Sequence, residues 1–160
     1  MLKWTWLGGM MFVVACLLPA VAGGQSNNRP WSMAGWEMGY MAHAAVWGFS
    51  DGSVIYVRRI RPLTESQALC VAGAAVVSNW LMVASCLMAY IGYRVGNPRK
   101  WAAYAARAAA YAALLGIPAT MAWVLARNLS LLVGGILWCA APMVLGYGLW
   151  RLGRRVPPGD

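Results

Sequence analysis

Long stretches without charge, separated by short polar segments, are the main pattern along this chain. Residues 66–93 contain no charged side chain, and residues 101–126 contain one, Arg107. About 20 consecutive apolar residues suffice for a helix to cross the hydrocarbon core of a bilayer, so each stretch predicts a transmembrane helix. Only residues 94–100 separate the two stretches. A connection this short predicts an antiparallel helical hairpin.

Two further apolar stretches, one near each end of the chain, complete the pattern. We therefore expect an all-α integral membrane protein that forms a single membrane domain over residues 1–160. Its four predicted transmembrane helices lie near residues 4–22, 67–93, 101–126 and 129–150. The composition agrees, because 61% of the residues are hydrophobic and 11% are charged, which is atypical of a soluble domain.

The first apolar stretch has a second interpretation. Lys3 precedes it and residues 20–22 (Ala-Val-Ala) end it, so it resembles a signal peptide that would be cleaved off. However, the stretch is nearly long enough to span, and Trp4 and Trp6 suit an anchor at the membrane interface. We favour a retained helix.

Residues 23–66 form a long outer loop between the first two predicted helices. The loop begins with a polar linker, residues 23–30, and continues into an aromatic segment, residues 31–49. On a helix, four ring-bearing residues of that segment share one face; they are Trp36, Tyr40, His43 and Trp47. A helix that also carries Glu37 suits the membrane surface better than the bilayer centre, so we expect an interfacial helix over residues 31–49. A fifth transmembrane span is the alternative.

The formal net charge of +9 would suggest a nucleic-acid partner if the protein were soluble. Here the basic residues cluster at the ends of the predicted helices, and no nucleic-acid-binding motif is recognisable. We therefore expect no nucleic-acid partner. We interpret the charge as a topology signal and as affinity for a lipid bilayer with anionic headgroups.

The basic loop at residues 94–100 sets the predicted orientation. It contains Arg94, Arg99 and Lys100, and clusters of Lys and Arg favour the cytoplasmic side of a membrane. With four spans, the N-terminus and the C-terminus are then cytoplasmic as well. Lys is rare while Ala, Gly, Arg and Trp abound, which suggests a GC-rich bacterial genome. We therefore expect the bacterial inner membrane.

Two polar side chains fall in the middle of the helix predicted for residues 67–93. An amide in hydrocarbon requires a hydrogen-bond partner, so the face that carries Asn79 and its neighbour Ser78 is expected to point into the bundle. We favour hydrogen bonding to another helix for this pair. Contact with a ligand or an ion is the alternative.

Arg107 lies about two turns into its predicted helix, between Tyr104 and Tyr111. Its long side chain is expected to reach the cytoplasmic lipid phosphates, with the tyrosine rings covering its plane. The residues expected at the lipid headgroups are Arg107, Arg94, Arg99 and Lys100.

The aromatic segment also holds weak candidates for a metal site. Thioether and imidazole ligands suit Cu(I), which makes Met38, Met41 and His43 candidate copper ligands. His43 follows two residues after Met41, so it points elsewhere unless the helix ends there. Methionine is also a common filler of irregular apolar surfaces. We favour that interpretation and expect no cofactor.

Residues that could carry out catalysis are scarce. The sequence shows a lone histidine and few acids, without an evident nucleophile, a phosphate-binding loop or a metalloprotease motif. We therefore expect a protein that is not an enzyme but an accessory, assembly or structural subunit, bound to other membrane subunits or to its own copies. The alternative is a small transporter or a copper-handling protein, which could use the helix breaks expected at Pro118 and Pro142.

Overall fold

The computed structural model describes residues 2–26, 29–47, 64–95, 97–127 and 129–155. This part of the chain is mostly helical, with helices α1 (Leu2–Leu17), α2 (Gly35–Trp47), α4 (Glu65–Arg94), α5 (Pro98–Arg127) and α6 (Val133–Arg155). Among them, α4, α5 and α6 are long and apolar enough to cross a membrane, whereas α1 is a shorter apolar helix. The helical class is therefore confirmed, and three of the predicted helices have the length and composition to cross a membrane.

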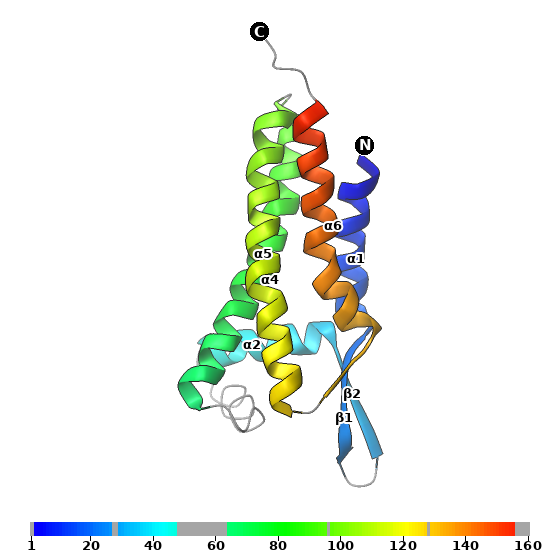
Figure 1. The fold of residues 1–160 in the computed structure, drawn as a ribbon, viewed down its shortest axis with the longest axis vertical. Coiled ribbons are helices and arrows are strands. Elements are labelled where there is room, and N and C mark those ends of the chain that lie inside the picture. The colour runs from blue at the N-terminus through cyan, green and yellow to red at the C-terminus, as the bar shows by residue number, and fades with distance from the viewer. Residues whose placement is uncertain (1, 27–28, 48–63, 96, 128, 156–160) are drawn as a thin grey trace.

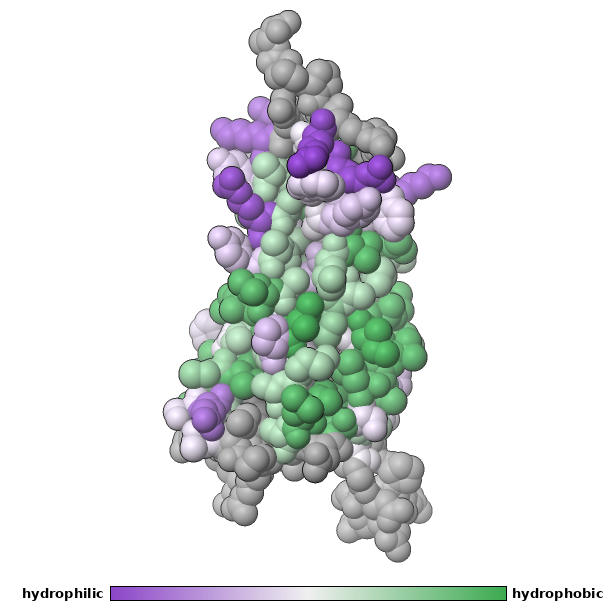
Figure 2. Space-filling model, viewed as in Figure 1, coloured by the Kyte–Doolittle hydropathy of each residue, from purple (hydrophilic) through white to green (hydrophobic). Residues whose placement is uncertain are grey.

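Four helices run side by side along the long axis of the molecule, and α2 runs across that axis (Figure 1). The N-terminus, the C-terminal end of α6 and the turn between α4 and α5 lie at one end of the bundle. Hydrophilic residues gather at this end of the visible face, and a broad apolar band covers its middle (Figure 2). Among the described residues of this face, the most hydrophilic side chains therefore lie mainly at the end that carries the turn between α4 and α5.

The hairpin of α4 and α5 packs closely because small residues line the contact. Ala102, Ala105, Ala109 and Ala112 recur at helical spacing on α5 and are no more than 1% exposed. The two helices also share hydrogen bonds. The hydroxyl of Ser85 donates to the carbonyl of Ala105 over 2.7 Å. Short side chains let the backbones approach, which is how helices associate in lipid without a hydrophobic driving force.

The start of each hairpin helix follows from local sequence. Thr64 caps α4 in a reciprocal arrangement: its side chain accepts from the backbone N–H of Gln67, whose side chain accepts from the backbone N–H of Thr64. Helix α5 begins at Pro98, where the missing amide hydrogen costs nothing and the fixed φ favours a helix.

Helix α1 packs along α6 through two glycines. A Cβ built on Gly8 would lie 2.7 Å from the backbone nitrogen of Leu145, and one built on Gly148 would lie 2.8 Å from the Cβ of Trp4. Neither position has room for a side chain as the helices stand. The absence of side chains at these crossings allows α1 to reach α6 closely.

The expectation of an all-α protein is wrong at one end of the bundle, where a small sheet forms. Strands β1 (Pro19–Ser26), β2 (Arg29–Ala34) and β3 (Ser130–Leu131) make three antiparallel strands in the order β2-β1-β3. Residues 23–26 and 29–30 of the predicted polar linker therefore belong to strands β1 and β2.

Two predicted spans need corrected bounds because of that sheet. The helix predicted for residues 4–22 ends at Leu17, since Pro19 lacks the amide hydrogen that would continue it, and residues 19–22 join β1. The helix predicted for residues 129–150 begins only at Val133, because β3 uses the preceding residues. The two middle helices match their predicted ranges to within three residues at each end.

The predicted interfacial helix is shorter than expected. Its first four residues belong to β2, and α2 starts at Gly35, where a Cβ would overlap the carbonyl oxygen of Ala15. With 13 residues, α2 is about 20 Å long at 1.5 Å per residue, too short for a hydrocarbon core of about 30 Å. Because α2 is this short and also runs across the bundle axis (Figure 1), it does not fit the alternative of a fifth span at residues 31–49. Residues 48–63 of the predicted outer loop lie outside the described part.

Candidate functional site

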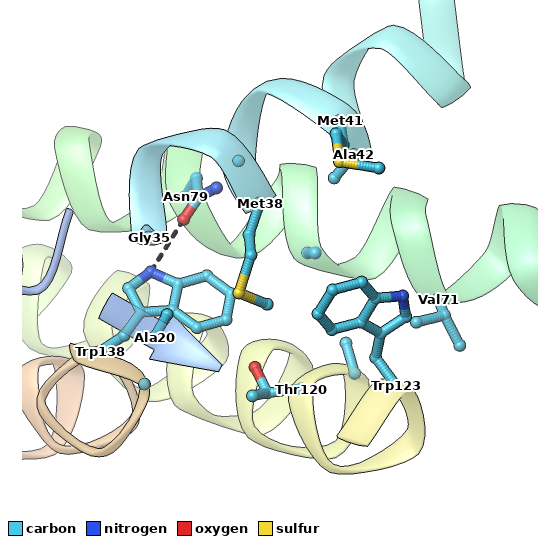
Figure 3. A pocket seen from close by; sticks show the side chains of 14 residues that line it. Ala20, Gly35, Met38, Met41, Ala42, Val71, Asn79, Thr120, Trp123 and Trp138 are labelled. Carbon is cyan, nitrogen blue, oxygen red and sulfur yellow. Dashed lines mark hydrogen bonds between the residues drawn. The ribbon is translucent and has the colours of Figure 1, made fainter. Parts of the chain in front are cut away.

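Helix α2 covers a small cavity in the bundle at the end that carries the sheet (Figures 1 and 3). The cavity has a volume of about 30 Å³. Its walls come from four helices and strand β1, and they include Met38 and Met41 of α2, Asn79 of α4, Thr120 and Trp123 of α5 and Trp138 of α6. Elements that are far apart in the sequence therefore surround a few polar side chains in an otherwise apolar interior.

A hydrogen bond between two helices forms the polar centre of this cavity. The indole N–H of Trp138 donates to the side-chain oxygen of Asn79 over 3.1 Å (Figure 3). Gly39 of α2 lies against the same amide, because a Cβ built there would be 3.7 Å from the nitrogen of Asn79. The structure therefore places Asn79 toward the bundle, between α2, α4 and α6.

The neighbouring hydroxyls bond to helix carbonyls. Ser78 donates to the carbonyl of Ala112 on α5 over 2.8 Å and is 4% exposed. Thr120 donates to the carbonyl of Gly116, one turn earlier on its own helix, also over 2.8 Å. Ser78 therefore ties α4 to α5, while Asn79 ties α4 to α6.

The candidate copper ligands are only partly brought together. Met38 and Met41 both line the cavity, but His43 does not. The Nδ1 atom of His43 lies 2.7 Å from the carbonyl oxygen of Gly39, to which it donates, and its ring stands edge-on to Trp80. Within the described residues, no group of three His, Cys, Asp or Glu side chains could hold a metal ion.

Glu37 stabilises the start of α2. Its carboxylate accepts a hydrogen bond from the backbone N–H of Ala34 over 2.8 Å. A carboxylate in the first turn also interacts favourably with the positive end of the helix dipole. This contact gives Glu37 a local structural role at the end of β2.

The predicted headgroup residues occupy different surroundings. Arg94 donates to the hydroxyl of Tyr90 over 3.0 Å at the end of α4, and Lys100 is exposed near the start of α5. Arg107 is exposed and lines a groove between α5 and α6. The side chain of Arg99 lies outside the described part of the chain.

Thr120 and Trp138 were not singled out from the sequence. The indole of Trp138 was a weak signal, because a donor in the middle of a predicted span needs an acceptor. Which acceptor it finds depends on how α4 and α6 are rotated, and no local pattern encodes that rotation.

The size of the cavity limits its chemistry. Pockets for small molecules usually measure about 300–1,000 Å³, whereas a cavity of about 10–15 Å³ is enough to hold one water. The cavity beneath α2 is therefore large enough for water or a single ion and too small for an organic substrate. Neither a protein-family model, nor a curated protein, nor a solved structure matches this chain.

Proposed function

We propose that this chain is a four-span protein of the bacterial inner membrane that serves as a non-catalytic accessory or assembly subunit. Both termini and the turn between α4 and α5 are cytoplasmic. Helix α2 lies at the outer surface of the inner membrane, on the side away from the cytoplasm, and docks on a partner membrane protein.

The length of the helices and the position of the charges support the membrane placement. Helix α1, with 16 residues, is about 24 Å long, so it crosses a hydrocarbon core of about 30 Å with local thinning or with help from the residues that follow it. The cationic end of the bundle faces the cytoplasm under the positive-inside rule.

The observation that carries the docking role is the exposed aromatic face of α2. Trp36, Tyr40 and Trp47 are 57%, 65% and 67% exposed. They point away from the cavity side of the helix, which is formed by Met38, Met41 and Ala42. Trp and Tyr are enriched in the centres of protein interfaces, where rigid rings cover a large area at low entropic cost.

Purification in a mild detergent tests this role. The wild-type chain is expected to co-purify with a membrane protein in a fixed ratio. The double substitution Trp36→Ala and Trp47→Ala should abolish this co-purification. Trp6→Ala is the matched control, because Trp6 is 64% exposed on α1. Loss of the partner in Trp6→Ala as well, or its retention in the α2 variant, would contradict docking through α2.

Copper handling is the second candidate, because Met38 and Met41 both line the small cavity that Asn79 also lines. Thioethers favour Cu(I). Replacing both methionines by leucine should then release bound Cu(I) to a chelator, and unchanged Cu(I) affinity would exclude this site. Transport has less support, since Pro118 is exposed on the outside of the bundle.

A further inference from the structure

A second hollow, larger than the cavity beneath α2, runs along the outside of the bundle. It is a groove of about 960 Å³ between α5 and α6. Its α5 side is a strip of small residues, Ala103, Ala106, Ala110 and Ala113, which recur at helical spacing. Pro118 and Pro142 mark its far end. The groove is thus lined by apolar side chains over most of its length.

The groove has the length of a lipid chain. From Ala103 to Pro118 it follows 15 residues of α5, or about 22 Å at 1.5 Å per residue. One leaflet of the hydrocarbon core is about 15 Å thick, half of about 30 Å. The groove can therefore hold an acyl chain across one leaflet and still extend to the level of the headgroup.

Two arginines lie at the cationic end of this apolar groove. Arg107 of α5 and Arg154 of α6 both line it, and none of the described lining residues is an acid. The guanidinium of Arg154 stacks 4.2 Å above the ring of Trp150. A cation at membrane depth is costly without a counter-charge, and no acid among the described groove residues supplies one, so an anionic ligand would stabilise this pair.

The spacing of the two helices indicates that the two arginine side chains reach similar levels of the groove. A Cβ built on Gly146 would lie 3.5 Å from the Cβ of Ala109, and the carbonyl of Ala106 is 3.9 Å away, so α6 at residue 146 is level with α5 near residue 107. The helices are antiparallel (Figure 1). Moving four residues along each helix toward the cytoplasmic end therefore places Ala103 level with Trp150.

The direction of helical side chains brings both cations to that level. A helical side chain covers the turn before its own Cα. Arg107 therefore extends toward Ala103 and the cytoplasmic end, whereas Arg154 extends back to Trp150, where its guanidinium is observed. Two planar guanidinium groups at similar levels on the two helices that line the groove suit the oxygens of a phosphate.

We propose that this groove binds one anionic glycerophospholipid of the cytoplasmic leaflet. The phosphate lies between Arg107 and Arg154, and an acyl chain lies along the alanine strip. A net anionic headgroup is preferred over a zwitterionic one, because no described acid in the groove would hold an ammonium group. A partner helix is a poorer occupant, because it would bury both guanidinium groups without a counter-charge. The proposal rests on the membrane placement and not on docking through α2.

Native mass spectrometry of the detergent-purified, delipidated chain tests this proposal by titration with phosphatidylglycerol or phosphatidylcholine. One phosphatidylglycerol per chain is expected to bind more tightly than phosphatidylcholine. Arg107→Gln or Arg154→Gln should weaken phosphatidylglycerol binding about tenfold or more, the effect of losing a charge-assisted hydrogen bond. Arg94→Gln is the control, since it removes one charge at the same end of the bundle outside the groove.

A second pair of variants tests the apolar part. Ala110→Phe fills the groove without a change of charge and should lower the affinity for phosphatidylglycerol. Leu87→Phe on the exposed face of α4 should not. Circular dichroism verifies that each variant is folded, and the exposed Arg107→Gln substitution decides the question if Ala110→Phe does not fold.

Several results would overturn the lipid site. The first is equal affinity for phosphatidylglycerol and phosphatidylcholine. The second is a loss of phosphatidylglycerol affinity in Arg94→Gln as large as that in Arg107→Gln or Arg154→Gln. The third is no binding of either lipid. A dimer that carries no lipid and separates in Ala110→Phe would show a second copy in the groove instead. Because these substitutions leave the α2 surface untouched, failure of the lipid site and failure of the docking role are distinguishable.

Discussion

The surroundings of Asn79 could be predicted in part from the sequence. Its amide lies among apolar residues, which predicted a position facing another helix. The structure gives it an indole partner, Trp138, which lies 59 residues away in the sequence. The need for a partner follows from the chemistry of the residue. The identity of the partner follows from the packing of α4 against α6, and the sequence pattern carries no information about it.

Replacing Asn79 by leucine should destabilise the bundle by about 0.6–2 kcal/mol, the range for hydrogen bonds between helices in membranes. The indole N–H of Trp138 would lose its acceptor. A double-mutant cycle with Trp138→Phe isolates the pair, because the second substitution should cost little once Asn79 is gone. The free energy of unfolding in a bilayer or in mixed micelles is the measurement. Fully additive effects of the two substitutions would show that the hydrogen bond contributes nothing.

At the scale of elements, the charge pattern predicted the positions of α4 and α5 well, but it did not predict the sheet. Long uncharged stretches bounded by Arg and Lys define a helix whatever its neighbours are. The strands are short, and β1 pairs with residues 130–131, more than 100 positions further along the chain. That pairing depends on α1 and α6 lying side by side. Only Pro19, which breaks the predicted first span, signalled that the helix ends early.

The contact between α1 and α6 leads to a prediction about Gly8 and Gly9. Because alanine has the higher helix propensity, replacing either glycine by alanine should stabilise the helix itself by about 1 kcal/mol. At Gly8 the new Cβ would lie under 3 Å from the backbone of Leu145, whereas at Gly9 the nearest atom is 3.8 Å away. Gly8→Ala should therefore destabilise the protein by about 1–3 kcal/mol through overpacking, and Gly9→Ala should not. Thermal unfolding in detergent measures both, and equal melting temperatures would refute close packing at Gly8.

At the scale of the whole molecule, the arrangement of helices and charges forms the basis of the functional proposals. Both termini and the turn between α4 and α5 share one end, and the sheet and α2 share the other (Figure 1). The four predicted helices placed both termini and the loop at residues 94–100 at one end and the aromatic segment at the other, but they did not predict the sheet. The sequence pattern did not predict the cavity or the groove between α5 and α6, because both depend on which faces of neighbouring helices meet.

Cysteine labelling in spheroplasts tests this arrangement most directly. Single cysteines replace Lys3, Asn97 or Ser130, all exposed, in a variant whose four native cysteines are alanine. A maleimide that does not cross membranes should label position 130 and leave positions 3 and 97 unlabelled until the membrane is opened. Labelling of position 97 in intact spheroplasts, with position 130 protected, would contradict the proposed topology and with it the cytoplasmic lipid site.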